Sequence, residues 1–297
     1  MSNSYACEGF VQCVDYNPQS TDQFFFGTTR KVLGMVDKRK QGIASNFFND
    51  AMVNALYVYR DGITVMTGDA LGALKTWDIR SGRCIQVYMN EPTKKPISHI
   101  AMYHGPSSSD EPRYMAVNSY DNILRVYDRG LDPVQTPLRL IHVLKGHRTK
   151  NWPIKCAFFQ GRQSPIPVNR QSERLPDIED VLFDGSRSAQ IESILLATGS
   201  ADCQVYSYAM TTAPSVASPI PSTQPSQPEP AGITSPPLAP QTQQPHGSWD
   251  IAQRLNGHTD RVYAVDFHPT DTVVASCSAD FGVKIWAMRR RDVGAPI

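Results

Sequence analysis

The stretch that decides the fold is residues 255–288, which read LNGHTDRVYAVDFHPTDTVVASCSADFGVKIWAM. It contains short runs that alternate apolar and polar residues with period two and that are rich in Val, Ile and aromatic residues. Gly, Pro and Asp residues stand between the runs, where tight turns join neighbouring strands. Nothing of comparable strength in the chain has helical period. This pattern predicts small antiparallel sheets and an all-β protein.

Related units recur along the chain. The Leu-x-Gly-His opening reappears within 144–161, and a Ser-Ala-Asp followed six residues later by an aromatic residue reappears within 194–210. Further units lie at 97–130, at 52–89 with Trp77-Asp78, and in degenerate form at 11–39. Once insertions are removed, the spacing is about 40–45 residues, which is the length of a four-stranded propeller blade.

The Gly-His…Trp-Asp pattern resembles the WD40-repeat family, and the resemblance covers nearly the whole chain apart from two insertions. It implies an all-β WD40 β-propeller occupying residues 1–297 as a single domain. Five blades are visible, at about 11–50, 51–95, 96–146, 147–257 and 258–288. The insertions, 161–192 and 211–249, are predicted to be disordered. The second of them is rich in Pro, Ser and Gln, a composition that buries too little apolar surface to order itself.

The number of blades leaves three interpretations open. The family usually closes its ring with about seven blades, so five indicate an incomplete or N-terminally shortened seven-bladed propeller. Alternatively, a partner's strands complete an open ring. In the third interpretation the ring closes with five blades, and residues 4–10 supply the outermost strand of the last blade.

Ser, His and Asp residues in the last unit raise the question of catalysis. By resemblance, His258, Ser276 or Ser278, Asp280 and Trp286 form one buried hydrogen-bonded set that is structural. Each of these polar groups is costly to bury unpaired, which favours their satisfying one another. The catalytic alternative requires an exposed serine at a strained turn, and the chain has no GxSxG. A second structural set is expected from the fourth unit, made of His147, Ser200, Asp202 and Tyr208.

Composition sets further limits on function. The formal net charge is +1, from 29 basic and 28 acidic residues, so no global field favours nucleic acid or lipid. Six cysteines are scattered without CxxC spacing, and no nucleotide or metal motif occurs, so we expect neither a cofactor nor a metal site. The sequence shows no secretory signal or membrane-length apolar stretch. A cytoplasmic or nuclear, non-catalytic protein is the prediction.

The resemblance implies that other proteins or peptides bind around the mouth of the central channel. The contact residues are expected just after the Gly-His turns and at the turns between the second and third strands. These candidates are Lys150, Asn151, Trp152, Asp260, Arg261, Tyr263 and Tyr120. Small-molecule substrates and membranes are not expected as partners, and nucleic acid is expected only indirectly, through a complex. The leading hypothesis is a scaffold for a multiprotein complex.

Two alternative functions remain open. The segments WDIR (77–80) and VDKR (36–39) are similar to the WDxR motif through which some WD40 proteins bind the adaptor of cullin-type ubiquitin ligases. The adaptor-binding candidates are Arg39, Asp78 and Arg80, although Asp-x-Arg is also a common local charge pair at a turn. The order of the motifs is also faintly similar to the WD40 splicing-factor branch, which suggests a subunit of an RNA-processing or chromatin complex.

Overall fold

The computed structural model describes residues 3–104, 110–130, 132, 134–161, 193–211 and 251–287. All regular secondary structure in these residues is β-strand, and every strand pairing is antiparallel. The all-β prediction is therefore confirmed. The two predicted insertions and the segment after residue 287 lie almost entirely outside the described residues.

The strands form five sheets, each built from strands that are consecutive in the chain. The first contains β1 (Val11–Tyr16), β2 (Gln23–Thr28), β3 (Val32–Asp37) and β4 (Ile43–Phe48). The second contains β5 (Val53–Val58), β6 (Thr64–Asp69), β7 (Ala73–Asp78) and β8 (Arg83–Met89). The third contains β9 (Ile97–Tyr103), β10 (Tyr114–Ser119), β11 (Ile123–Asp128) and β12 (Arg139–Lys145). The fourth contains β13 (Cys156–Phe158), β14 (Ser193–Thr198), β15 (Gln204–Thr211) and β16 (Ile251–Asn256), and the fifth contains β17 (Val262–Phe267), β18 (Val273–Ser278) and β19 (Val283–Ala287).

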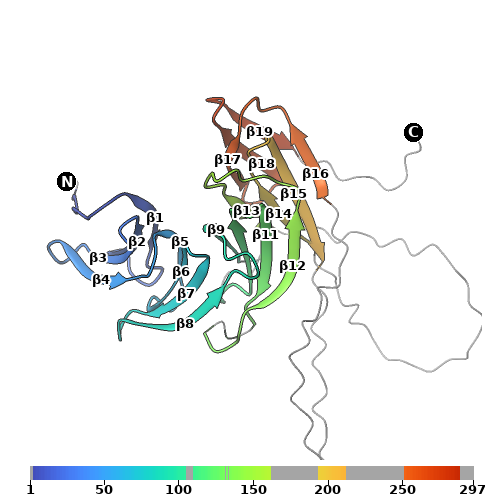
Figure 1. Cartoon of the computed structure of the whole chain (residues 1–297). Coiled ribbons are helices and arrows are strands. Elements are labelled where there is room, and N and C mark those ends of the chain that lie inside the picture. The colour runs from blue at the N-terminus through green and yellow to red at the C-terminus, as the bar shows by residue number, and fades with distance from the viewer. Residues whose placement is uncertain are drawn as a thin grey trace, which may run out of the picture.

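The sheets are arranged as the blades of a β-propeller. The first strand of each sheet is innermost, because β1, β5, β9, β13 and β17 contact one another in sequence order. The last strand of each four-stranded sheet lies at the outer rim, and the sheets follow one another along an open arc (Figure 1). The first and fifth sheets lie at opposite ends of this arc.

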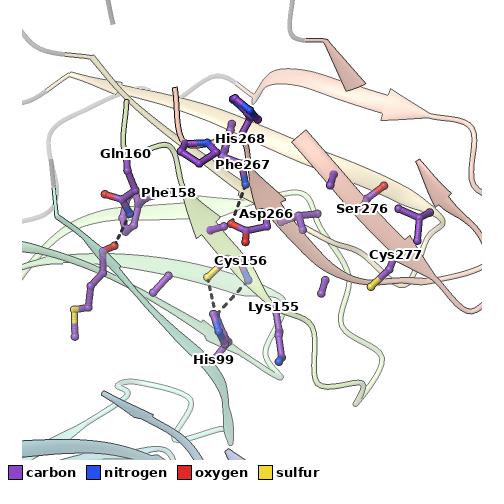
Figure 2. Close-up of a pocket in the computed structure, with 18 residues that line it drawn as sticks. His99, Lys155, Cys156, Phe158, Gln160, Asp266, Phe267, His268, Ser276 and Cys277 are labelled. Atoms are coloured by element: carbon purple, nitrogen blue, oxygen red, sulfur yellow. Dashed lines mark hydrogen bonds between the residues drawn. The ribbon is translucent and has the colours of Figure 1, made fainter. Parts of the chain in front are cut away.

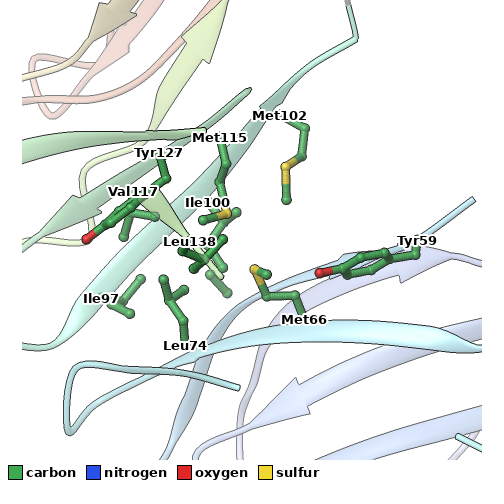
Figure 3. Packing of buried hydrophobic residues seen from close by; sticks show 11 residues of the cluster. Tyr59, Met66, Leu74, Ile97, Ile100, Met102, Met115, Val117, Tyr127 and Leu138 are labelled. Carbon is green, nitrogen blue, oxygen red and sulfur yellow. The ribbon is translucent and has the colours of Figure 1, made fainter. Parts of the chain in front are cut away.

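Apolar side chains fill the space between successive sheets. Figure 3 shows the cluster between the second and third sheets, where Met66 and Leu74 pack against Ile97, Met115 and Tyr127. Equivalent clusters join the first sheet to the second, the third to the fourth, and the fourth to the fifth. Burial of these apolar faces is what holds neighbouring sheets together along the arc.

The third interpretation of the blade number, in which residues 4–10 pair with the last sheet, is contradicted by this structure, since among the described residues that sheet contains only β17, β18 and β19. Instead, this segment lies on the first sheet: the ring of Tyr5 packs edge-on against Phe24, with centroids 6.0 Å apart. Phe10 and Thr29 exchange hydrogen bonds, one of them between their backbones. Aromatic contact and local pairing hold the segment on the sheet that follows it directly in the chain, so a five-bladed closed ring does not form.

Candidate functional site

The Ser, His and Asp residues of the last unit are joined in one network. Nδ1 of His258 lies 2.7 Å from a carboxylate oxygen of Asp280, and Nε2 lies 2.8 Å from Oγ of Ser276. The indole N–H of Trp286 donates to the same Oγ at 2.7 Å. The hydroxyl of Ser276 therefore donates to His258 while accepting from Trp286. Ser276 is 1% exposed, so a substrate has no access to its oxygen.

Asp280 is held ionised at the turn between β18 and β19. Burial opposes its ionisation, but hydrogen bonds from His258 and from the backbone N–H groups of Thr259 and Gly282 outweigh that effect, and the pKa of the carboxyl lies well below its usual value. Ser278 has a different role, since its hydroxyl donates to the backbone carbonyl of Asp260 at 2.9 Å. Of the two candidate serines, Ser276 is the member of the network.

The second predicted set does not form. Nε2 of His147 lies 3.0 Å from the side-chain oxygen of Asn118, on the preceding sheet, and among the described residues no hydrogen bond joins its ring to the side chains expected to accompany it. The hydroxyl of Ser200 accepts from the backbone of Arg148 instead. The carboxylate of Asp202 accepts from Tyr206 at 2.7 Å.

Two substitutions explain this difference. The residue ten before Tyr208 is Thr198, which corresponds to Ser276 in the last unit, and its hydroxyl accepts from the amide of Asn118 at 3.1 Å. Asn118 thus stands between His147 and Thr198. A phenol also places its hydroxyl differently from an indole N–H, and Tyr208 donates to the backbone carbonyl of Lys145.

A related network in the second sheet was missed by the sequence reasoning. The indole N–H of Trp77 donates to the hydroxyl of Thr67 at 3.0 Å, and the amide of Asn49 donates to Asp69 at 3.0 Å. The signal that identifies it is spacing, because Thr67 precedes Trp77 by the same ten residues that separate Ser276 from Trp286.

Three of the predicted binding residues form a stacked cluster between the fourth and fifth sheets. The guanidinium of Arg261 lies over the ring of Trp152, 4.1 Å from its centroid. Its Nε donates to the hydroxyl of Tyr263 at 2.8 Å, and the two aromatic rings meet edge to face at 5.7 Å. The bond to Tyr263 and the charge of Asp260 raise the pKa of Arg261 despite some desolvation. Trp152 remains 38% exposed.

The cluster is held by a tight turn ahead of β13. The backbone N–H of Trp152 donates to the carbonyl of Thr149, whose own N–H and hydroxyl both bond to Asn122 of the third sheet. Ile154 is fully buried just beyond it. A short turn tied to two sheets presents its side chains on a stiff support.

The other predicted binding residues lie around this cluster or apart from it. Lys150 and Asn151 are exposed within the same turn, both with left-handed backbone (φ 46° and 62°). The carboxylate of Asp260 lies 3.6 Å from Nη1 of Arg261. Tyr120 is partly buried in the turn between β10 and β11, where its N–H donates to the carbonyl of Pro96, and it is not part of the stack.

The Asp-x-Arg segments are organised locally. Arg39 forms a two-bond pair with Asp37, at 2.9 and 2.7 Å, and its side chain is 63% exposed. Asp78 accepts from the backbone N–H of Arg80 and from Ser81. The side chain of Arg80 lines a shallow groove together with Phe48 and Trp77.

A cavity of about 590 Å³ lies beside β9, β13, β17 and β18. Figure 2 shows Cys156 and His99 in it, with Sγ 3.6 Å from Nδ1. Burial raises the pKa of the Cys156 thiol to about 12 and lowers the pKa of His99 to about 4, so both groups are neutral near pH 7. A catalytic cysteine needs a thiolate at working pH, so this pair is not an activated nucleophile.

Neither a metal cluster nor a membrane-spanning helix is found in the part of the chain that the structure covers. No three His, Cys, Asp or Glu side chains there are grouped to hold a metal ion. None of the described segments is a helix long and apolar enough to cross a membrane.

Repeated antiparallel sheets with their first strands innermost define a protein of the β-propeller class. Residues 249–287 match the family model described as WD domain, G-beta repeat. This match covers the last repeat, including all four members of its hydrogen-bonded network. Together with the architecture, it supports the WD40-repeat family, whose members generally mediate protein–protein interactions.

Proposed function

We propose that this protein is a non-catalytic platform on which a multiprotein complex assembles, and that a protein partner binds over Trp152, Arg261 and Tyr263. One observation carries the proposal: an arginine is stacked on a partly exposed tryptophan where two sheets meet. Trp, Tyr and Arg are the residue types that contribute most to binding at protein interfaces. Their side chains are already ordered here, so a partner loses little entropy by ordering them.

The experiment compares proteins that copurify with the tagged full chain and with two variants. Trp152→Ala removes the centre of the cluster. We expect the amount of each specific partner that copurifies to fall about tenfold or more, as for a typical interface hot spot. Tyr16→Ala is the matched control, because Tyr16 is an exposed aromatic residue under Lys38, at the end of β1 in the first sheet. Unchanged partners with Trp152→Ala, or equal losses with both variants, would contradict the proposal.

A second candidate function is that of a substrate receptor of a cullin-type ubiquitin ligase. It is favoured by the position of Arg80, whose side chain lines a groove with the 78%-exposed Phe48. Charge reversal at Arg39 and Arg80 is expected to abolish adaptor pull-down if this function holds. Intact adaptor binding by the double variant would exclude it.

A further inference from the structure

Positive charges are clustered on the surface around Trp152, although the net charge of the whole chain is only +1. Segment 145–155 reads KGHRTKNWPIK and has no acidic residue. Its cations are all exposed, and none is ion-paired with another described residue: Lys145, Arg148, Lys150 and Lys155. Arg261 adds a fifth positive charge beside them.

The acidic residues next to this surface are largely engaged within the protein. Three turns that hydrogen-bond to the surface each carry an aspartate, and each carboxylate already has a side-chain partner: Asp121 with Arg125, Asp202 with Tyr206, and Asp280 with His258. Only Asp260 faces Arg261: its carboxylate accepts from the backbone N–H of Arg261 at 2.7 Å and lies 3.6 Å from Nη1, too far for a hydrogen bond to the guanidinium. Hydrogen bonds from Tyr206 and His258 fix the carboxylates of Asp202 and Asp280 without removing their negative charge. These two carboxylates and Asp260 therefore offset part of the positive charge, and the five cations outnumber them.

Arg261 is oriented to receive an anion. Stacking on Trp152 fixes the plane of its guanidinium, and the bond from Nε to Tyr263 fixes its rotation. Among the described residues, Nη2 has no hydrogen-bond partner, and Nη1 has only the long ion pair with Asp260. The two terminal nitrogens of a guanidinium are spaced to bind both oxygens of a carboxylate or phosphate.

We propose that the partner segment bound at this surface is an acidic peptide, anchored by an anionic side chain on Arg261, with Arg148, Lys150 and Lys155 holding its further negative charges. The inference rests on the proposed function, since it names the chemistry of the partner at the same site. The anion is a carboxylate or a phosphorylated side chain, which share this mode of recognition.

The stacking geometry favours a peptide over single-stranded RNA. Proteins that bind single strands without reading sequence place exposed aromatic faces under successive bases. Here Arg261 already covers one face of Trp152, and Tyr263 meets the tryptophan by an edge. The cluster thus offers cationic donors rather than a free stacking platform.

The test measures fluorescence anisotropy of short labelled probes with the full chain. The probes are a peptide of alternating Glu and Ser, the same peptide with phosphoserine in place of Glu, the same with Gln, and an oligouridine. We expect the acidic peptides to bind at least about tenfold more tightly than the Gln peptide, and to weaken as salt rises from about 50 to 200 mM. The tighter of the two acidic probes identifies the anion.

Variants locate the anchor. Arg261→Ala is expected to weaken binding of the acidic peptide about tenfold or more, and Arg261→Lys to restore only part of it, since an ammonium keeps the charge but not the planar fork. Asp260→Asn removes the negative charge that competes with the peptide for Arg261, and it is expected to tighten binding. The test therefore includes a predicted gain of affinity as well as a predicted loss. Lys38→Ala removes an exposed cation that also lies over an aromatic ring, and it is expected to have no effect.

Three outcomes would overturn the inference. The first is equal binding of the acidic and Gln peptides. The second is an acidic peptide that binds regardless of Arg261 and Asp260. The third is Arg261-dependent binding of oligouridine alone, which would assign the surface to RNA. If no acidic probe binds while Trp152→Ala still loses its copurifying partners, the acidic-peptide inference fails and the proposed platform function stands.

Discussion

Single side chains show most directly why Ser276 is structural. Its hydroxyl forms hydrogen bonds with both His258 and Trp286, and the other nitrogen of the imidazole is hydrogen-bonded to Asp280. Catalysis would require the same oxygen to be exposed, but Ser276 is buried. The residue types of a hydrolase are present, while the geometry is that of a polar core in which every member is satisfied.

Ser276→Ala is expected to destabilise the protein. The change leaves the indole N–H of Trp286 and Nε2 of His258 without a partner, at a cost of about 1–3 kcal/mol in the free energy of unfolding. Urea denaturation measures this loss. Cys277→Ala, at the adjacent and exposed position, is the control and is expected to change stability little. Equal stability of the two variants would show that the network contributes nothing.

At the scale of the strands, the packing of the fifth sheet on the fourth requires their backbones to approach closely. A Cβ atom at Gly199 would lie 2.4 Å from the backbone carbonyl oxygen of Val262, the first residue of β17. The neighbouring Ser200 carbonyl accepts from the N–H of that same residue at 2.9 Å. The contact is between backbones, so no side chain can rotate away to make room.

Gly199→Ala is therefore expected to force the fifth sheet away from the fourth, with a loss of stability of about 3 kcal/mol. The matched control is Gly42→Ala, where the added methyl group meets no atom within 4 Å but the backbone is left-handed (φ 76°). That variant is expected to lose only about 1 kcal/mol. Chemical denaturation compares the two, and a smaller effect at Gly199 would show that the two sheets can separate without cost.

Across the molecule, histidines buried at different sheets link global stability to pH. Burial lowers the pKa of His142 and His147 to about 4 in the folded protein. In the unfolded chain a histidine titrates near pH 6.5, so between about pH 6.5 and 4 the unfolded state binds protons that the folded state does not. Stability must therefore fall as pH is lowered through this range, by up to about 1.4 kcal/mol per pH unit for each such histidine.

Urea midpoints at successive pH values between 7 and about 4.5 test this dependence. His147→Gln is expected to be less stable than the wild type near pH 7, with the difference narrowing as pH falls, because the variant lacks one of the titrating groups. His268→Gln changes an exposed histidine and serves as the control. Parallel curves for wild type and His147→Gln would contradict the linkage.

The amino-acid order alone was enough to predict the strands and their grouping into repeated units. Period-two alternation between turn residues is a local signal, and it repeats at blade spacing. The set around Trp286 could also be anticipated, since its members lie on two neighbouring strands of one sheet and in the loops that adjoin that sheet. The match of residues 249–287 to a WD40 repeat agrees with that interpretation.

Tertiary structure decided the features that depend on contacts between sheets. His147 is hydrogen-bonded to Asn118 of the preceding sheet. The spacing of residues within one repeat cannot identify this partner, because it belongs to another repeat. Trp152 and Arg261 are more than a hundred positions apart in the chain, and only the packing of the fourth sheet against the fifth stacks one on the other. Local periodicity encodes strands, but polar partners across an interface depend on which side chains the packed sheets bring within a few ångströms.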